Sequence, residues 1–149
     1  MGLDMYLNGN NGNEVYWRKA NQIHRWFVNN CQDGIDECQQ AEVTRKDLNE
    51  LLNKCNDILN KANKMLPKGW ATTEDFWSNE AQKINPGWEV PQMLKDYAKS
   101  ILPATAGFFF GGTGYDLWYF RDVASTADNL ISFLSKEEED SSFTYKSSW

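Results

Sequence analysis

Apolar side chains return every three or four positions in three long segments of the chain, at residues 14–31, 44–64 and 116–135. Polar and charged side chains fill the positions between them, which is the pattern of a helix with one face in a core. A shorter segment at residues 91–101 has the same period. The pattern therefore predicts three main helices and one short helix.

Sequence signals mark the ends of these helices. Asn13 can cap the first helix, and Thr44 with Asp47 three residues later has the spacing of a capping box. Asp116 is expected to cap the third main helix, and Pro103 stops the short one. The residues of the third main helix that are expected to face inward are Leu117, Phe120, Ala124, Ala127, Ile131 and Leu134.

Four short segments have the composition or the alternation of strands. Residues 2–8, 37–43 and 141–149 alternate between apolar and polar side chains over part of their length. Residues 105–111 contain the run Phe108–Phe110 between glycines. Because aromatic side chains favour strands and glycine permits tight turns, we expect residues 105–111 to form the buried central strand.

These elements predict an α+β fold, in which the three main helices pack against a small, mainly antiparallel sheet of about four short strands. The chain of 149 residues, 41% of them hydrophobic, is expected to form a single domain over residues 1–149. Residues 67–90 are the least regular part, and a loop that carries three tryptophans is expected to pack as a lid or to contact a partner. These tryptophans are Trp70, Trp77 and Trp88.

The charge of the chain limits the classes of partner. A net charge of −6 argues against direct binding of nucleic acid or anionic membranes, and is compatible with a basic partner or a DNA-mimicking role. No apolar run approaches the roughly 20 residues that span a bilayer, and the first residues lack the features of a secretory signal. Cys31, Cys38 and Cys55 form no CxxC pair, which indicates reduced thiols and a cytoplasmic location.

Two motifs invite a chemical interpretation that their surroundings do not support. Gly107 and Gly112 meet half of a phosphate-binding loop, but Thr113 stands where the motif requires lysine. A strand-to-helix turn is therefore favoured over a nucleotide site. His24 is the only histidine, and no further ligands have the spacing of a zinc site. We expect a histidine in the core or at its boundary that donates to a carbonyl or a carboxylate, with no metal and no cofactor.

Two sets of charged side chains have similarly ordinary interpretations. Arg18, Lys19 and Arg25 form a basic patch, which we interpret as a solvated helix face, although it could hold an anionic ligand beside tryptophan. Asp116 and Asp122 are candidates for general acid–base chemistry, but their spacing does not place them in one cleft. Surface charge and helix capping explain both carboxylates, which favours a protein without enzymatic activity and leaves a weak enzyme as the alternative.

Several segments together resemble a family of small proteins encoded by tailed phages and prophages. They are MGLDMYL at the start, VYWRKANQIHRWFV, QDGIDECQQ, LPATAGFFFGGTGYDLWY and the final SSW. The resemblance implies a viral or prophage origin and a bacterial cytoplasmic setting, with no catalytic residues to transfer. Small acidic phage proteins often disable a host factor, including CRISPR and other defence components, and this association suggests such a role.

Two functions follow as hypotheses. The first is a protein that binds and inhibits a host protein, with aromatic anchors supplying the energy and acidic residues steering a basic partner. Its expected contact residues are Trp70, Trp77, Trp88, Tyr115, Asp116, Trp118, Tyr119, Glu137, Glu138, Glu139 and Asp140. The second is a binder of small molecules or nucleotides, acting as a signal sponge or a weak enzyme. Its expected ligand-binding residues are Trp17, Arg18, His24, Arg25, Gly112 and Thr113.

Overall fold

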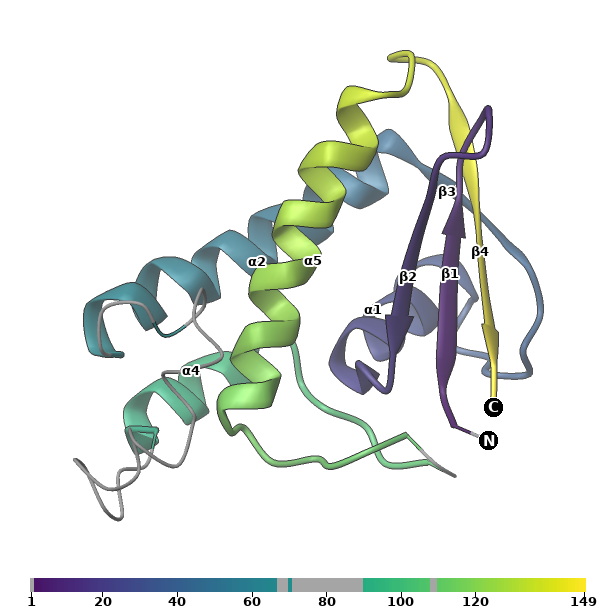
Figure 1. The fold of residues 1–149 in the computed structure, drawn as a ribbon. Coiled ribbons are helices and arrows are strands. Elements are labelled where there is room, and N and C mark those ends of the chain that lie inside the picture. Colours follow the sequence, from purple (N-terminus) through teal and green to yellow (C-terminus); the bar gives the residue numbers. More distant parts are fainter. Residues whose placement is uncertain (1, 67–69, 71–89, 108–109) are drawn as a thin grey trace.

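The computed structural model describes residues 2–66, 70, 90–107 and 110–149. Over these residues, one four-stranded antiparallel sheet has its helices on one side (Figure 1). The predicted α+β fold is therefore confirmed. The elements are β1 (Asp4–Asn8), β2 (Glu14–Arg18), α1 (Asn21–Cys31), β3 (Ala41–Thr44), α2 (Arg45–Met65), α4 (Gln92–Ile101), α5 (Leu117–Ser135) and β4 (Ser142–Ser148).

The sheet has the order β2-β1-β4-β3, so β1 and β4 are its central strands. The expected central strand at 105–111 is wrong, because residues 105–107, 110 and 111 form no strand. Phe108 and Phe109 lie outside the described residues. Phe110 is buried but reaches the core from an irregular segment, while Phe143 and Tyr145 of β4 fill the centre of the sheet.

Residues 14–18 form the second strand of a hairpin, not the start of the first helix. Asn11 and Gly12 have φ values of 57° and 77°, so the turn after β1 uses the left-handed conformations that Asn and Gly tolerate. Val15 and Trp17 are buried, and the other residues of β2 are exposed. Alternating burial over these five residues is the pattern of a strand with one face in the core. Helix α1 begins only at Asn21.

The second helix is confirmed together with its predicted cap. Thr44 Oγ1 accepts a hydrogen bond from the Asp47 amide at 3.2 Å, and Asp47 Oδ2 accepts one from the Thr44 amide at 2.9 Å. The strand predicted at 37–43 is confirmed only at its end, because β3 begins at Ala41. Before it, the Gln39 side chain bonds to the backbone of two nearby residues, which holds a tight loop instead of a strand.

Helix α5 packs against α2 on one side and contacts β2 on the other, and its buried face differs from the predicted one. Ile131, expected to face inward, is 54% exposed, and Leu117 and Ala124 are only partly buried. A helix packed between two layers needs a broader apolar face than a single stripe supplies. The buried residues of α5 are Tyr119, Phe120, Val123, Thr126, Ala127, Leu130, Phe133 and Leu134.

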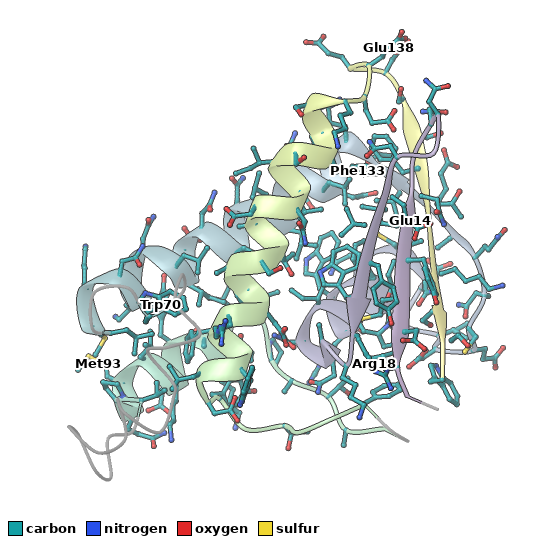
Figure 2. All side chains as sticks on the ribbon, in the orientation of Figure 1. Glu14, Arg18, Trp70, Met93, Phe133 and Glu138 are labelled. Atoms are coloured by element: carbon teal, nitrogen blue, oxygen red, sulfur yellow. The ribbon has the colours of Figure 1, made fainter. Side chains whose placement is uncertain are left out.

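Aromatic side chains join the sheet to the helices. Phe27 of α1 stacks on Tyr145 of β4, with ring centroids 4.0 Å apart and planes 9° apart. Phe133 of α5 meets Phe143 edge to face, and Figure 2 shows Phe133 between the helix and the sheet. These contacts place the centre of the core where α1 and α5 cover β1 and β4.

Candidate functional site

A hollow of about 380 Å³ lies where the end of β2, the glycine-rich segment and the start of α5 meet. Its volume is within the usual range of ligand pockets. Side chains of both charges line it. The lining residues are Arg18, Lys19, Asn21, Gln22, Gly111, Gly112, Gly114, Asp116, Trp118, Tyr119 and Asp122.

The first wall is the junction between β2 and α1. Lys19 has a φ of 56°, a left-handed conformation that turns the chain sharply from the strand into the helix. Gly111 packs directly against this turn, because a Cβ there would lie 3.2 Å from Lys19 Cβ. Its own φ of 86° also favours glycine. The glycine-rich segment is thus fitted closely to the end of β2.

Asn21 connects this wall to the glycine-rich segment. It is 2% exposed, and its Nδ2 donates to the carbonyls of Phe110 at 3.1 Å and Gly112 at 2.9 Å. Its Oδ1 accepts a hydrogen bond from the Thr105 amide at 3.1 Å. One buried amide therefore satisfies three backbone groups of the segment 105–112, whose described residues form no helix or strand.

The start of α5 forms the opposite wall. Asp116 caps the helix by accepting a hydrogen bond from the Tyr119 amide at 3.1 Å, as the sequence predicts. Tyr119 is buried, and its hydroxyl donates to the Leu102 carbonyl at 2.6 Å, which ties α5 to the end of α4. Trp118 instead is 68% exposed, with the Arg121 guanidinium 5.4 Å from its ring centroid.

Asp122 is a carboxyl group of the hollow whose pKa is perturbed by its surroundings. Burial raises the pKa of its carboxyl to about 6, and the charge of Asp116 adds to this, while Arg121 and a hydrogen bond from Gln22 act in the opposite direction. A partly buried carboxyl with a raised pKa in a hollow is a frequent feature of functional sites. The structure thus brings Asp116 and Asp122 into one hollow, which the sequence spacing does not indicate.

The raised pKa gives Asp122 a measurable effect on stability. A carboxyl whose pKa rises from 3.8 to about 6 on folding contributes most at low pH, and this contribution is lost as the pH rises through about 6. Asp122→Asn should therefore raise the free energy of unfolding by about 1–3 kcal/mol at neutral pH and by much less near pH 4. Urea denaturation of both proteins across this pH range measures the difference.

The exposed Asp128 on the same helix provides the matched control. Asp128→Asn removes the same charge without removing a buried carboxylate, so it should give no comparable gain at neutral pH. An equal gain for Asp122→Asn at both ends of the pH range would show that ionisation is not its cause.

The expected partner-binding residues separate into distant groups. Asp116, Trp118 and Tyr119 line the hollow, and Tyr115 supports it by accepting a hydrogen bond from the Ala104 amide at 3.0 Å. The acidic residues lie beyond the other end of α5, roughly 27 Å away at 1.5 Å per residue. These are Glu137, Glu138, Glu139 and Asp140, and Figure 2 labels Glu138 at this end.

Glu137 has a structural role in this acidic turn. Its carboxylate accepts hydrogen bonds from the Asn10 amide at 2.7 Å and from Asn10 Nδ2 at 2.9 Å, and it also contacts Asn13. These hydrogen bonds lower its pKa and hold the β1–β2 turn against the end of α5. Glu138, Glu139 and Asp140 are exposed, so they remain available to a partner.

Among the three tryptophans of the irregular segment, the structure places only Trp70. It is 3% exposed, and its Nε1 donates to Asn63 Oδ1 at 2.9 Å. Its ring meets Phe120 edge to face, so Trp70 belongs to the core and is not an exposed anchor. Trp77 and Trp88 lie outside the described residues.

Only two of the six expected ligand-binding residues line the hollow, namely Arg18 and Gly112. Thr113 follows Gly112 and is exposed, but it is not part of the lining. Trp17 is directed into the core, where its Nε1 donates to Thr126 Oγ1 at 2.8 Å. Arg25 donates to the Ala104 carbonyl at 3.0 Å and lines a different hollow of about 220 Å³.

His24, the sixth expected ligand-binding residue, is fully buried, which confirms the prediction of a core histidine. Its Nε2 lies 3.0 Å from Asp36 Oδ2, and its Nδ1 lies 2.6 Å from the Tyr145 hydroxyl. Because a carboxylate can only accept, the proton belongs on Nε2, and Tyr145 donates to Nδ1. Burial lowers the pKa of His24 despite the opposing effect of Asp36, so the imidazole is neutral.

Six lining residues are in neither list of expected contacts, namely Lys19, Asn21, Gln22, Gly111, Gly114 and Asp122. The buried side-chain amides of Asn21 and Gln22 follow directly after the β2–α1 turn. Two adjacent polar residues at the start of an otherwise apolar helix could have indicated this wall of the hollow from the sequence. Over the described part of the chain, no group of three or more side chains could hold a metal ion. No helix there is long and apolar enough to cross a membrane.

The comparisons with known proteins give no match: no protein-family model, no curated protein and no solved structure matches this chain. The resemblance to phage and prophage proteins therefore stays a prediction.

Proposed function

We propose that the chain is a phage-encoded accessory protein that binds and inhibits a host protein, with CRISPR and other antiviral defence components as the first targets to test. The observation that carries this proposal is Trp118, which is 68% exposed at the rim of the hollow. Tryptophan and arginine are enriched among the residues that dominate binding energy at protein interfaces, and Arg121 lies against this ring.

The charges of the hollow favour a protein partner over a simple anion. Arg18 and Lys19 line the same hollow as Asp116 and Asp122, so it contains two basic and two acidic side chains. Mixed charges around an aromatic anchor are typical of the polar rim of a protein interface. The exposed acidic turn at 138–140 and the net charge of −6 would steer a basic partner toward this molecule.

Truncation of the anchor tests this proposal. Trp118→Ala should reduce the affinity for the host protein by at least about tenfold, because central aromatic anchors usually contribute 2 kcal/mol or more. The partner is first identified by affinity purification from a host lysate, and the affinity of the purified pair is then measured by calorimetry. The melting temperature should change little, since Trp118 is exposed.

Ile131→Ala is the control, because Ile131 is also an exposed apolar residue of α5, at 54%. It should leave the affinity unchanged. Equal affinities for Trp118→Ala and the unaltered protein would remove the hollow from the interface, and the exposed acidic turn would then be the surface to test.

A second candidate function has one observation in its favour. Arg18 and Lys19 lie beside Gly112 in a hollow of ligand size, with the ring of Trp118 available for stacking on a base. A nucleotide or cyclic dinucleotide at 100 times its dissociation constant would stabilise the protein by about 2.7 kcal/mol, a rise of several degrees in melting temperature. A thermal-shift screen that shows no such rise, for a protein that captures a host protein, favours the first function.

A further inference from the structure

Strand β2 is an edge of the sheet, and β1 is the strand that pairs with it. An edge strand presents unpaired backbone N–H and C=O groups to its surroundings and can pair with another chain. On the side of β2 away from β1, a groove of about 220 Å³ separates the strand from α5. The backbone edge of β2 is thus accessible beside a groove.

The hydrogen bonds at the two ends of the hairpin determine which residues of β2 point outward. The Lys19 amide donates to the Leu3 carbonyl at 2.8 Å, and the Gly9 amide donates to the Asn13 carbonyl at 2.8 Å. In an antiparallel ladder, bonded pairs alternate with non-bonded pairs, so Val15 and Trp17 of β2 bond toward β1. The backbone groups of the remaining residues of β2 point away from β1. These residues are Glu14, Tyr16 and Arg18.

We infer that this edge pairs with the same edge of a second copy of the chain, antiparallel and centred on Tyr16. The strand reads Glu-Val-Tyr-Trp-Arg, and opposing it to itself places Glu14 of each copy against Arg18 of the other. Tyr16 then faces Tyr16 across the two-fold axis. Opposite charges and aromatic rings in directly opposed positions both stabilise strand pairs.

The direction of the backbone N–H and C=O groups along β2 supports this register independently of the charges. All three opposed pairs are formed by residues whose N–H and C=O groups point outward. Each bonded pair exchanges two hydrogen bonds, so the interface gains roughly six. A shift of one residue would oppose the outward groups of one copy to groups of the other copy that are already bonded to β1. The two four-stranded sheets would therefore join into one continuous sheet with two-fold symmetry.

The flank of α5 beside β2 is compatible with this arrangement. Asn129 and Ser132 of α5 line the groove beside β2, and both have short polar side chains. Lys136 lies at the Glu14 end of the strand, and Asp122 lies at the Arg18 end. The two ends of this flank therefore carry opposite charges, as the two ends of β2 do.

Removal of one outward N–H tests the inference. In sedimentation equilibrium across a dilution series, the unaltered chain should reach twice its 17.2 kDa mass. Tyr16→Pro should remain monomeric at concentrations where the unaltered chain is dimeric, because proline lacks the donor at the centre of the interface but is tolerated where an edge N–H faces solvent. Tyr16→Val is the matched control, since it removes the same ring, retains the N–H and should still dimerise.

Cysteine crosslinking provides a second test that does not depend on the proline variant. Directly opposed residues of a bonded pair have Cα atoms about 5.5 Å apart, which is within disulfide range. Tyr16→Cys should therefore form a covalent dimer under mild oxidation. Tyr6→Cys, one strand further in, would place its two thiols roughly 14 Å apart and should crosslink no more than the unaltered chain.

A monomeric unaltered chain throughout the dilution series would overturn the inference, as would equal crosslinking of the two cysteine variants. A Tyr16→Pro protein that remains dimeric would also overturn it. None of these outcomes depends on the function proposed above, because no host protein and no ligand is present in the experiment.

Discussion

Replacing Phe27 with alanine should lower the free energy of unfolding by about 4 kcal/mol, because a fully buried aromatic side chain is lost and a cavity remains. Phe27 is 0% exposed and stacks on Tyr145. Trp17 and Trp26 meet the same ring edge to face, at centroid distances of 5.9 Å and 5.2 Å. Such aromatic pairs add to the energy of burial itself. Guanidinium denaturation measures the loss of stability, and the dependence of the free energy of unfolding on denaturant concentration should stay unchanged.

Two further variants show whether the loss depends on the size of the buried side chain and on its burial. Phe27→Leu keeps an apolar side chain at this position and should cost clearly less than alanine, about 1–2 kcal/mol. Ile131→Ala removes an exposed aliphatic side chain from α5 and should cost under about 1 kcal/mol. A loss below about 1.5 kcal/mol for Phe27→Ala would mean that the contact between α1 and β4 is not the centre of the core.

The elements that the sequence predicts best are those whose signals are local. Helix α2 combines a capping box at Thr44 with an apolar stripe that runs through the whole helix, and both signals lie within one segment. The last strand, β4, alternates regularly between buried and more exposed positions, so its pattern also suffices. In both elements the local preference and the final packing agree.

Two incorrect predictions have a common physical cause. Residues 14–18 fit both a helical and an alternating pattern, and five residues are too few to separate the two periods. The turn before them decides, since Asn11 and Gly12 join β1 to β2 as a hairpin. At 105–111, aromatic content favours a strand, but a strand requires a partner, and β1 and β4 already pair with each other.

The hollow shows the limit of prediction for the site. Arg18 and Gly112 were expected to act together because each has a recognisable chemistry, and the fold does bring them into one lining. Asn21 and Asp122 acquire their roles only through contacts between segments about a hundred residues apart. Spacing along one helix could not reveal that Asp122 shares a hollow with the cap of that helix. Such contacts depend on the tertiary fold, which local periodicity does not determine.

Replacing Asn21 with alanine should lower the free energy of unfolding by about 2–4 kcal/mol, because three hydrogen bonds are lost and buried backbone groups remain without partners. The side chain donates to the Phe110 and Gly112 carbonyls and accepts from the Thr105 amide. Water can reach Gly112, which is exposed, but not the buried Phe110. Most of the loss in stability should therefore come from the Phe110 carbonyl, which is left without a hydrogen-bond partner.

Hydrogen exchange locates this effect within the chain. The Thr105 amide should lose most of its protection in Asn21→Ala, since its acceptor is removed, while amides in α2 should lose protection only by the global loss of stability. Asn30→Ala is the control on the same helix, because Asn30 is exposed and donates to the Trp26 carbonyl one turn earlier. It should cost under about 1 kcal/mol.

A selective loss at Thr105 would establish that one amide of α1 holds the wall of the hollow in place. Unchanged protection at Thr105, together with a loss of stability, would show that Asn21 acts through helix packing. The first outcome also predicts that Asn21→Ala weakens the binding of any partner or ligand beside Gly112. The wall of the hollow would be less ordered in the variant, and ordering it on binding would cost free energy.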